Sequence, residues 1–284
     1  MTVVPAPTRV RSVLFAPAVR RDVIAKLGRR GADLVVIDCE DATPVAMKEE
    51  GRAAARELAP VVARDARVAV RVNPVDSEWF AADVASLPEG LAAVVVPKVE
   101  TIEGLDRVAA ALEVAGRSDL GVFAGLETAL GVADARSLLA HRQVIAGYFG
   151  AEDFIADMGG VRTASNAEVV YARGAVALAG RLAEVPVVDQ VVTEIRTQDR
   201  FLDEAAEARA MGYVGKLCIH PGQVVAAHEA FTPSVEEVAT ARRLLAAYEA
   251  GIASGTAAID FEGRMVDEPL AVQARRIIEQ AEGA

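Results

Sequence analysis

Eight short apolar runs, rich in Val, Ile and Leu, recur along the chain and are separated by longer segments rich in Ala, Glu and Arg. The runs are continuous rather than alternating in polarity, which is typical of parallel strands buried on both faces. Their short length and β-branched content favour strands over buried helix segments. We expect strands at Ser12–Ala16, Leu34–Asp38, Val68–Asn73, Ala93–Pro97, Gly121–Leu126, Val144–Phe149, Val187–Val192 and Lys216–His220.

The segments between these runs have the periodicity of helices. In Thr101–Ala115, apolar residues recur every three or four positions and form one apolar face. Ala46–Arg64, Ala167–Ala183 and Asp203–Met211 show similar patterns. Alternation of strand and helix eight times predicts an α/β fold, a (β/α)8 TIM barrel. A doubly wound open sheet is the rival, but the first predicted strand is not followed by a Gly-rich phosphate loop.

More than sixty residues follow the eighth predicted strand, which is more than a barrel needs. We predict helices at Val235–Ala253 and Pro269–Ala281, joined by the polar, Gly-containing stretch Gly255–Asp267. We therefore assign the barrel to residues 1–232 and a C-terminal helical extension to residues 233–284. This extension would serve as a lid, as an oligomer arm or as both.

Charge and composition limit the partners that the protein can have. Its 41 Asp and Glu residues outnumber 30 Lys and Arg residues, which argues against nucleic acid or an anionic membrane as a partner. No apolar run approaches the ~20 residues of a membrane span, and none at the N-terminus has the length of a signal peptide. Cys39 and Cys218 lie in apolar runs, so we expect buried reduced thiols in a cytoplasmic protein.

Polar residues follow directly after several predicted strands, and barrel enzymes place their chemistry at these C-terminal strand ends. Glu127 and Asp153 follow consecutive strands, which lie ~4.8 Å apart in a sheet. Two carboxylates at this spacing suit Mg²⁺, which keeps water or substrate oxygens in its other positions. Each carboxylate could instead pair with a nearby Arg or cap a helix, and spacing alone does not separate these interpretations.

Arg71 lies at the end of the third predicted strand, in or near the barrel interior, where an unpaired cation is unfavourable. It could bind a substrate carboxylate or stabilise an oxyanion. It could also form a buried ion pair with Asp38 or Glu40. These interpretations are compatible, because an acidic neighbour can orient a catalytic arginine.

The acidic residues after the second predicted strand have two possible roles. Asp38, Glu40 and Asp41 could orient Arg71 or a metal-bound water, or they could cap the helix expected after Pro44. We favour capping for Asp41 and leave the role of Glu40 open.

Lys98 follows the fourth predicted strand and could be a Schiff-base lysine. A salt bridge to Glu100 or to a neighbouring strand end is the favoured interpretation, because a metal would make an imine unnecessary.

Seven short motifs occur in order along the chain, most of them at ends of predicted strands. Together they resemble the citrate lyase beta subunit group, with the malyl-CoA and citramalyl-CoA lyases, within the HpcH/HpaI aldolase superfamily. The likeness runs from about Arg11 to about Ala274. The motifs are Arg11-Ser-Val-Leu-Phe15, Asp38-Cys-Glu-Asp-Ala42, Arg71-Val-Asn73, Pro97-Lys-Val-Glu100, Glu127-Thr128, Gly150-Ala-Glu-Asp153 and Gly215-Lys-Leu-Cys-Ile-His-Pro-Gly-Gln223.

The resemblance implies a Mg²⁺-dependent carbon–carbon lyase. Its substrate would be a 3-hydroxyacyl thioester of citryl, malyl or citramalyl type, carried on CoA or acyl carrier protein and cleaved into a keto acid and an acetyl thioester. Two alternatives are a class II aldolase acting on a free hydroxy-keto acid and a beta subunit active only within a citrate lyase-type complex. A degenerate barrel serving as a scaffold is a fourth possibility, against which the retained Arg71, Glu127 and Asp153 argue.

The resemblance also implies roles for individual residues. Glu127 and Asp153 correspond to the metal ligands, and Arg71 corresponds to the arginine that faces the substrate carboxylate or thioester enolate. We add Glu40 as a further catalytic candidate. The substrate-binding set is Arg71, Glu127, Gly150 and Ala151.

The segment Gly263–Pro269 resembles the family's C-terminal motif, whose aspartate reaches into a neighbouring subunit's site in several lyases. This resemblance makes Asp267 the candidate acid–base and implies a homotrimer or a dimer of trimers. The alternative is that Asp267 is a helix N-cap just before Pro269.

Overall fold

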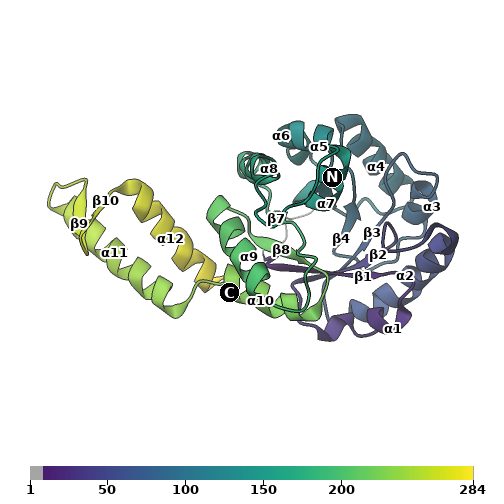
Figure 1. Ribbon diagram of the computed structural model, residues 1–284, viewed down its shortest axis with the longest axis horizontal. Coiled ribbons are helices and arrows are strands. Elements are labelled where there is room, and N and C mark those ends of the chain that lie inside the picture. The colour runs from purple at the N-terminus through teal and green to yellow at the C-terminus, as the bar shows by residue number, and fades with distance from the viewer. Residues whose placement is uncertain (1–8, 284) are drawn as a thin grey trace. The chain divides into compact units, whose positions relative to one another are not determined.

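Residues 9–283 are described by the computed structural model, and their eight parallel strands close into a barrel in sequence order. The first strand pairs with both the second and the eighth, which closes the sheet. Figure 1 shows helices arranged around the strands. The TIM barrel is confirmed. The strands are β1 (Ser12–Pro17), β2 (Leu34–Asp38), β3 (Val68–Arg71), β4 (Ala93–Val96), β5 (Val122–Leu126), β6 (Val144–Phe149), β7 (Val187–Asp189) and β8 (Gly215–Cys218).

Strands β3, β4, β7 and β8 end one to three residues earlier than their apolar runs predicted. The difference is clearest after β7, where pairing with β8 stops at Asp189. Val191 lines a cavity and Val192 is buried, so both are apolar because of packing rather than strand pairing. Apolar runs therefore mark burial, and hydrogen bonding between strands covers only part of each run.

The predicted long helices are present, and their apolar faces pack inward. In α4 the buried residues are Leu105, Val108 and Leu112, and the Thr101 side chain caps the helix by accepting from the backbone N–H of Gly104. Shorter helices went unpredicted because four to seven residues are too few to show a helical period. The helices of the barrel are α1 (Arg21–Ile24), α2 (Lys48–Val62), α3 (Phe80–Ala85), α4 (Ile102–Val114), α5 (Ala129–Ala133), α6 (Ala135–Leu139), α7 (Ala151–Asp157), α8 (Val170–Ala183), α9 (Asp199–Met211) and α10 (Pro221–Phe231), with 3-10 turns at Leu27–Arg29 and Val45–Met47.

The barrel interior is filled by inward-pointing side chains of the strands. Val36, Val95 and Leu217 belong to this core, and Phe123 packs edge-on against Tyr148 with ring centroids 5.5 Å apart. A filled interior leaves space for a ligand only where the strands end.

The chain divides into two compact units between His228 and Glu229, inside α10. The second unit contains α11 (Val235–Ala253), the antiparallel strands β9 (Ile259–Phe261) and β10 (Arg264–Val266), and α12 (Glu268–Glu282). The predicted polar stretch thus holds a hairpin, whose turn residues Glu262 and Gly263 both have positive φ as a two-residue hairpin turn requires. Strands of three residues are too short to show an alternating pattern.

The sequence-based expectation of a boundary after residue 232 falls a few residues beyond this division. Over residues 9–283, no helix is both long and apolar enough to cross a membrane.

Candidate active site

A cavity of about 400 Å³ lies at the C-terminal ends of the barrel strands. All four expected substrate-binding residues border it, together with Asp153. Its walls combine apolar residues of β1 and β8 with charged residues that follow β2, β3, β5 and β6. The lining residues are Phe15, Ala16, Pro17, Asp38, Asp41, Ala42, Arg71, Glu127, Tyr148, Gly150, Ala151, Glu152, Asp153, Val191, Leu217 and Ile219.

Arg71 is held from two sides by acidic residues. Its Nε and Nη2 donate to the two oxygens of Asp38, at 2.7 and 2.6 Å, because Asp38 and Arg71 are register partners on β2 and β3. Its Nη1 lies 3.1 Å from Oε2 of Glu40, and its guanidinium stands 5.1 Å from the centre of the Phe15 ring. Burial opposes the charge, but Asp38 outweighs it and the pKa of Arg71 is raised well above its ordinary value. Arg71 is therefore a permanent, oriented cation.

Lys98 connects three carboxyl groups from two parts of the chain. Its ammonium lies 2.5 Å from Oε1 of Glu40, 3.1 Å from Oδ2 of Asp41 and 3.3 Å from Oδ1 of Asp153. The expected salt bridge forms, but its partners follow β2 and β6, each two strands away from β4, rather than a neighbouring strand end. Burial raises the pKa of Glu40 although the cations Arg71 and Lys98 act against the shift.

The capping role favoured for Asp41 is wrong. Residue Met47 occupies the N-cap position of α2, and no side chain caps that helix or the 3-10 turn before it. The acidic residue turns instead toward Lys98, because a helix that begins at Lys48 is too far along the chain for Asp41 to cap it.

Glu127 is almost fully buried beside the cavity, with 1% of its surface exposed. Its Oε1 accepts from the backbone N–H of Lys98 at 2.8 Å and from the hydroxyl of Tyr148 at 3.0 Å. Burial raises the pKa of Glu127 to about 7, and the nearby carboxylates of Asp153 and Glu40 add to the shift. Gly150 makes room for this carboxylate, since a Cβ at that position would overlap Glu127.

Asp153 lies in the first turn of α7 and borders the same cavity as Glu127. Within residues 9–283, no cluster of three or more His, Cys, Asp or Glu side chains is arranged to hold a metal ion. Glu127 and Asp153 would therefore supply two protein oxygens, and Mg²⁺ is commonly held by one or two carboxylates with water and substrate completing its shell.

Seven charged residues at and beside the cavity, which we call the mouth cluster, are unbalanced in charge; Glu152 also lines the cavity but pairs with Arg162. The cluster contains five carboxyl groups and two cations: Asp38, Glu40, Asp41, Glu127 and Asp153 with Arg71 and Lys98. A surplus of negative charge and hard oxygen donors fits a divalent cation.

Asp267 belongs to the second unit. It occupies the N-cap position of α12, yet its side chain makes no capping hydrogen bond, so the capping alternative is wrong. Its Oδ1 is buried without a hydrogen-bond partner among the described residues. A buried carboxylate oxygen without a hydrogen-bond partner is energetically unfavourable unless another group binds it.

Two site residues were missed by sequence reasoning. Tyr148 and Phe15 lie within apolar runs, where each looks like an ordinary core residue. The signal available for Tyr148 was its hydroxyl, because a hydroxyl within a buried strand needs a hydrogen-bond partner. That partner is Glu127, and only the closed barrel places the two together.

A second polar cluster lies on the outer side of β7 and β8, which we call the β7–β8 network. Lys216 and Arg173, both completely buried, bind Asp189 from β8 and α8, and Lys216 also reaches Glu204 on α9. The outer members Arg200 and Glu207, also on α9, bind Glu204 and Arg173 respectively. This network holds the outer helices to the barrel wall.

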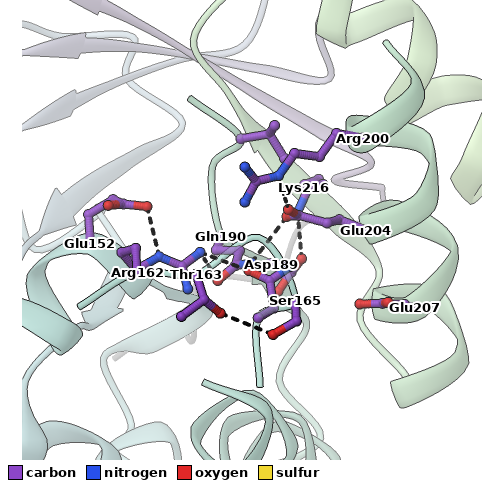
Figure 2. Close-up of polar contacts among 12 residues, drawn as sticks. Glu152, Arg162, Thr163, Ser165, Asp189, Gln190, Arg200, Glu204, Glu207 and Lys216 are labelled. Carbon is purple, nitrogen blue, oxygen red and sulfur yellow. Dashed lines mark hydrogen bonds and ion pairs between the residues drawn. The ribbon is translucent and has the colours of Figure 1, made fainter. Parts of the chain in front are cut away.

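The network extends toward the cavity through Arg162, as Figure 2 shows. Arg162 donates to Glu152 on α7 at 3.0 Å and to Gln190 at 3.4 Å, and Gln190 donates to Glu204 at 3.1 Å. The first turn of α7, which carries Asp153, is thus tied to β7 and α9.

A closed parallel barrel that gathers buried, perturbed charges around a cavity at its strand ends defines a TIM-barrel enzyme. The sequence model of the HpcH/HpaI aldolase/citrate lyase family matches residues 11–221. The chain belongs to the HpcH/HpaI aldolase/citrate lyase family. The resemblance noted from its motifs is confirmed, and this membership places the chain among the lyases.

Three similar proteins illustrate the family. A citrate lyase subunit beta-like protein of Deinococcus radiodurans is 47% identical over 96% of this chain and 97% of its own length. A (3S)-malyl-CoA thioesterase of Cereibacter sphaeroides is 31% identical over 96% and 94%. CitE of Mycobacterium tuberculosis, solved with magnesium, acetoacetate and coenzyme A, has a TM-score of 0.81 and 32% identity over 96% of this chain and 98% of its own.

Proposed function

We propose that the chain is a Mg²⁺-dependent lyase that cleaves a 3-hydroxyacyl thioester of citryl, malyl or citramalyl type into a keto acid and an acetyl thioester. The observation that carries this proposal is that Arg71, Glu127 and Asp153, from three different strand ends, border one cavity of about 400 Å³. Such a volume suits a small hydroxy acid. The acyl carrier would then extend outward, and the likeness to a CitE solved with coenzyme A favours CoA over acyl carrier protein.

Glu127 and Asp153 are the residues we propose to hold the metal. Mg²⁺ bound there would act as a Lewis acid and template for the oxygens of the acid portion. The Lys98 N–H and the Tyr148 hydroxyl fix the direction of the Glu127 carboxylate, as second contacts of metal ligands commonly do. With its pKa at about 7, Glu127 is about half ionised near neutral pH and would have to lose its remaining proton to serve as a metal ligand.

Arg71 is the residue we propose to stabilise the charge that cleavage leaves on the thioester enolate oxygen. A guanidinium has five N–H donors, so its contacts with Asp38 and Glu40 leave capacity for substrate. Because both acidic neighbours hold the group in place, it needs no reorganisation as charge develops. Glu40 assists by fixing the edge of Arg71 opposite to Asp38.

Asp267 is the proposed acid–base that moves the proton at the enolate carbon. Its missing capping bond and its buried, unpartnered Oδ1 support a role beyond holding α12. By family resemblance it would act in a neighbouring subunit's site, within a homotrimer or a dimer of trimers.

The deciding experiment is an assay of the purified chain with Mg²⁺ and a panel of substrates. The panel contains citryl-, malyl- and citramalyl-CoA, their acyl carrier protein counterparts and free hydroxy-keto acids. We expect Mg²⁺-dependent release of a keto acid and acetyl-CoA. Cleavage of free acids alone would identify a class II aldolase, and activity only after partner subunits are added would identify a complex-bound beta subunit. Accumulation of free malate and CoA would indicate that thioester hydrolysis is also catalysed.

We place this activity in the cytoplasm. Cys39 and Cys218 are buried and not joined in a disulfide, as is usual in reducing compartments.

A further inference from the structure

Lys98 has a backbone conformation that lysine rarely adopts. Its φ is +50°, in the left-handed region that favours glycine. Such a conformation persists in other residues only where surrounding contacts enforce it, and it concentrates at functional sites. Here the backbone N–H donates to Glu127 at 2.8 Å, so the same residue directs its main chain toward one carboxylate of the mouth cluster and its side chain toward three others.

The ammonium of Lys98 lies where the carboxyl groups of the mouth cluster come together. Glu40 and Asp41 reach it from the end of β2, and Asp153 reaches it from α7. The lysine side chain is 28% exposed, so it is not in the protein interior, and two of its partners, Asp41 and Asp153, line the cavity. Without this cation, Arg71 alone would face the five carboxyl groups.

We propose that Lys98 is a positioning residue that acts as the resident counter-ion of the mouth cluster. It holds Glu40, Asp41 and Asp153 together when no divalent cation is present, and its left-handed backbone makes this possible by fixing Glu127 at the same time. The inference rests on the proposed function, because it takes Glu127 and Asp153 as the metal ligands.

Two opposite effects follow from this role. A positive charge next to Asp153 repels a divalent cation bound there, so Lys98 lowers the affinity for Mg²⁺. The same charge relieves the repulsion among the carboxylates, so Lys98 stabilises the metal-free protein. A lysine with a purely structural role would affect stability alone.

The test compares Lys98→Met with the unchanged protein by calorimetry with Mg²⁺ and by thermal unfolding with and without EDTA. We expect Mg²⁺ to bind about tenfold more tightly or better in the variant, since one like charge is removed from the site. We also expect a lower Tm in EDTA, a larger rise of Tm with Mg²⁺ and slower turnover. Lys98→Arg keeps the charge and should retain the original Mg²⁺ affinity.

Two other lysines provide controls. Lys26→Met removes an exposed charge that does not belong to the mouth cluster and should change neither quantity. Lys216→Met removes a cation that binds two carboxylates in the β7–β8 network, and should lower Tm without changing the affinity for Mg²⁺.

The outcomes separate this inference from the proposed function. Unchanged or weaker Mg²⁺ binding in Lys98→Met would overturn the counter-ion role, and loss of Mg²⁺ binding in Asp153→Asn would show that the metal site nevertheless stands. Normal Mg²⁺ binding in both Asp153→Asn and Glu127→Gln would remove the metal site itself. If Lys98→Met does not fold in EDTA, thermal unfolding of both proteins over a range of Mg²⁺ concentrations gives the same comparison.

Discussion

The mouth cluster and the β7–β8 network are both dense groups of charged side chains, yet they are built differently. In the network, Asp189, Glu204 and Glu207 are matched by Arg173, Lys216 and Arg200. In the mouth cluster, five carboxyl groups face two cations beside a cavity. The positive and negative charges balance in the network but not in the mouth cluster.

The pKa values show the consequence of this difference. Burial raises the pKa of Glu127 in the mouth cluster to about 7. Burial also acts on Glu204 in the network, but the Lys216 charge and several hydrogen bonds outweigh it and lower the pKa to about 2. A balanced network fixes protonation and holds elements together, whereas an unbalanced cluster can titrate and can bind a cation.

The largest expected effect comes from removing either proposed metal ligand. Glu127→Ala or Asp153→Ala should abolish both Mg²⁺ binding and activity, because each supplies one of the two protein oxygens proposed for the ion. Calorimetry with Mg²⁺ measures the first and a substrate assay the second. Glu152→Ala, a neighbouring carboxylate that binds Arg162 instead, should keep Mg²⁺ binding. Undiminished affinity in both ligand variants would remove the mouth cluster from consideration as a metal site.

A variant of Asp267 tests whether a buried carboxylate without a hydrogen-bond partner also marks a functional residue in the second unit. Asp267→Asn should lower turnover by about 10²–10⁴-fold with Tm and Mg²⁺ binding nearly unchanged, because a general acid is lost but the fold is not. The control Asp260→Asn changes a carboxylate of the preceding β9–β10 hairpin and should stay active. Full activity in Asp267→Asn would exclude the catalytic role.

Mixing inactive Asp267→Asn with inactive Glu127→Ala during refolding tests the subunit arrangement. Recovery of activity is expected if Asp267 serves a neighbouring site, because mixed oligomers then contain some intact sites. Absence of recovery would contradict the arrangement between subunits. The catalytic role would then be judged from the activity of Asp267→Asn alone.

The network should respond to mutation in stability alone. Lys216→Met leaves Asp189 buried with one cation fewer, which we expect to lower the free energy of unfolding by about 3–5 kcal/mol. Urea unfolding measures this change, and Mg²⁺ affinity should not move. A changed Mg²⁺ affinity would show that the two clusters are coupled, for example through Arg162 and the first turn of α7.

Arg71 is one of the two cations of the mouth cluster and is also the residue proposed to stabilise the enolate. Arg71→Lys keeps the charge but loses the planar fork that binds Asp38 at two points, so turnover should fall by about 10²-fold. Arg107→Lys, at an exposed pair with Asp76, serves as the control. Near-normal turnover in Arg71→Lys would make Arg71 a structural residue.

The smallest expected effect is a dependence of Mg²⁺ affinity on pH. Because Glu127 must be ionised to bind the metal, affinity should rise by about tenfold between pH 6 and pH 8, measured by calorimetry. The raised pKa also favours the protonated form in the folded state, so this group destabilises the metal-free protein as pH rises from about 4.5 to about 7. Glu204, with its lowered pKa, stabilises the protein by a nearly constant amount in that range, and this contribution is lost only as pH falls from about 4.5 to about 2. An affinity independent of pH would contradict the shift assigned to Glu127.

The sequence allowed prediction of the barrel and of the residues around its cavity. Continuous apolar runs identified all eight strands, and polar residues directly after them identified Arg71, Glu127 and Asp153 as neighbours. The pairing of Arg71 with Asp38 or Glu40 was also foreseeable, since acidic and basic strand ends meet at one edge of a parallel sheet.

The partners of individual side chains were less predictable. Capping by Asp41 was the wrong expectation, and Glu100 is not among the residues that Lys98 contacts through the ion pairs described above. The β7–β8 network went unnoticed although Lys216 is a charged residue at the start of an apolar run.

Local pattern determined the eight barrel strands and most of the long helices of this chain, because burial periodicity and helix propensity act over a few residues. Tertiary structure alone decided that Lys98 turns into the left-handed region to reach Glu127 and that Tyr148 finds the same carboxylate. Those contacts join residues 21 to 29 positions apart. They form only when barrel closure fixes strand order and register, since that register sets which side chains share a cavity and how strongly burial shifts their pKa values.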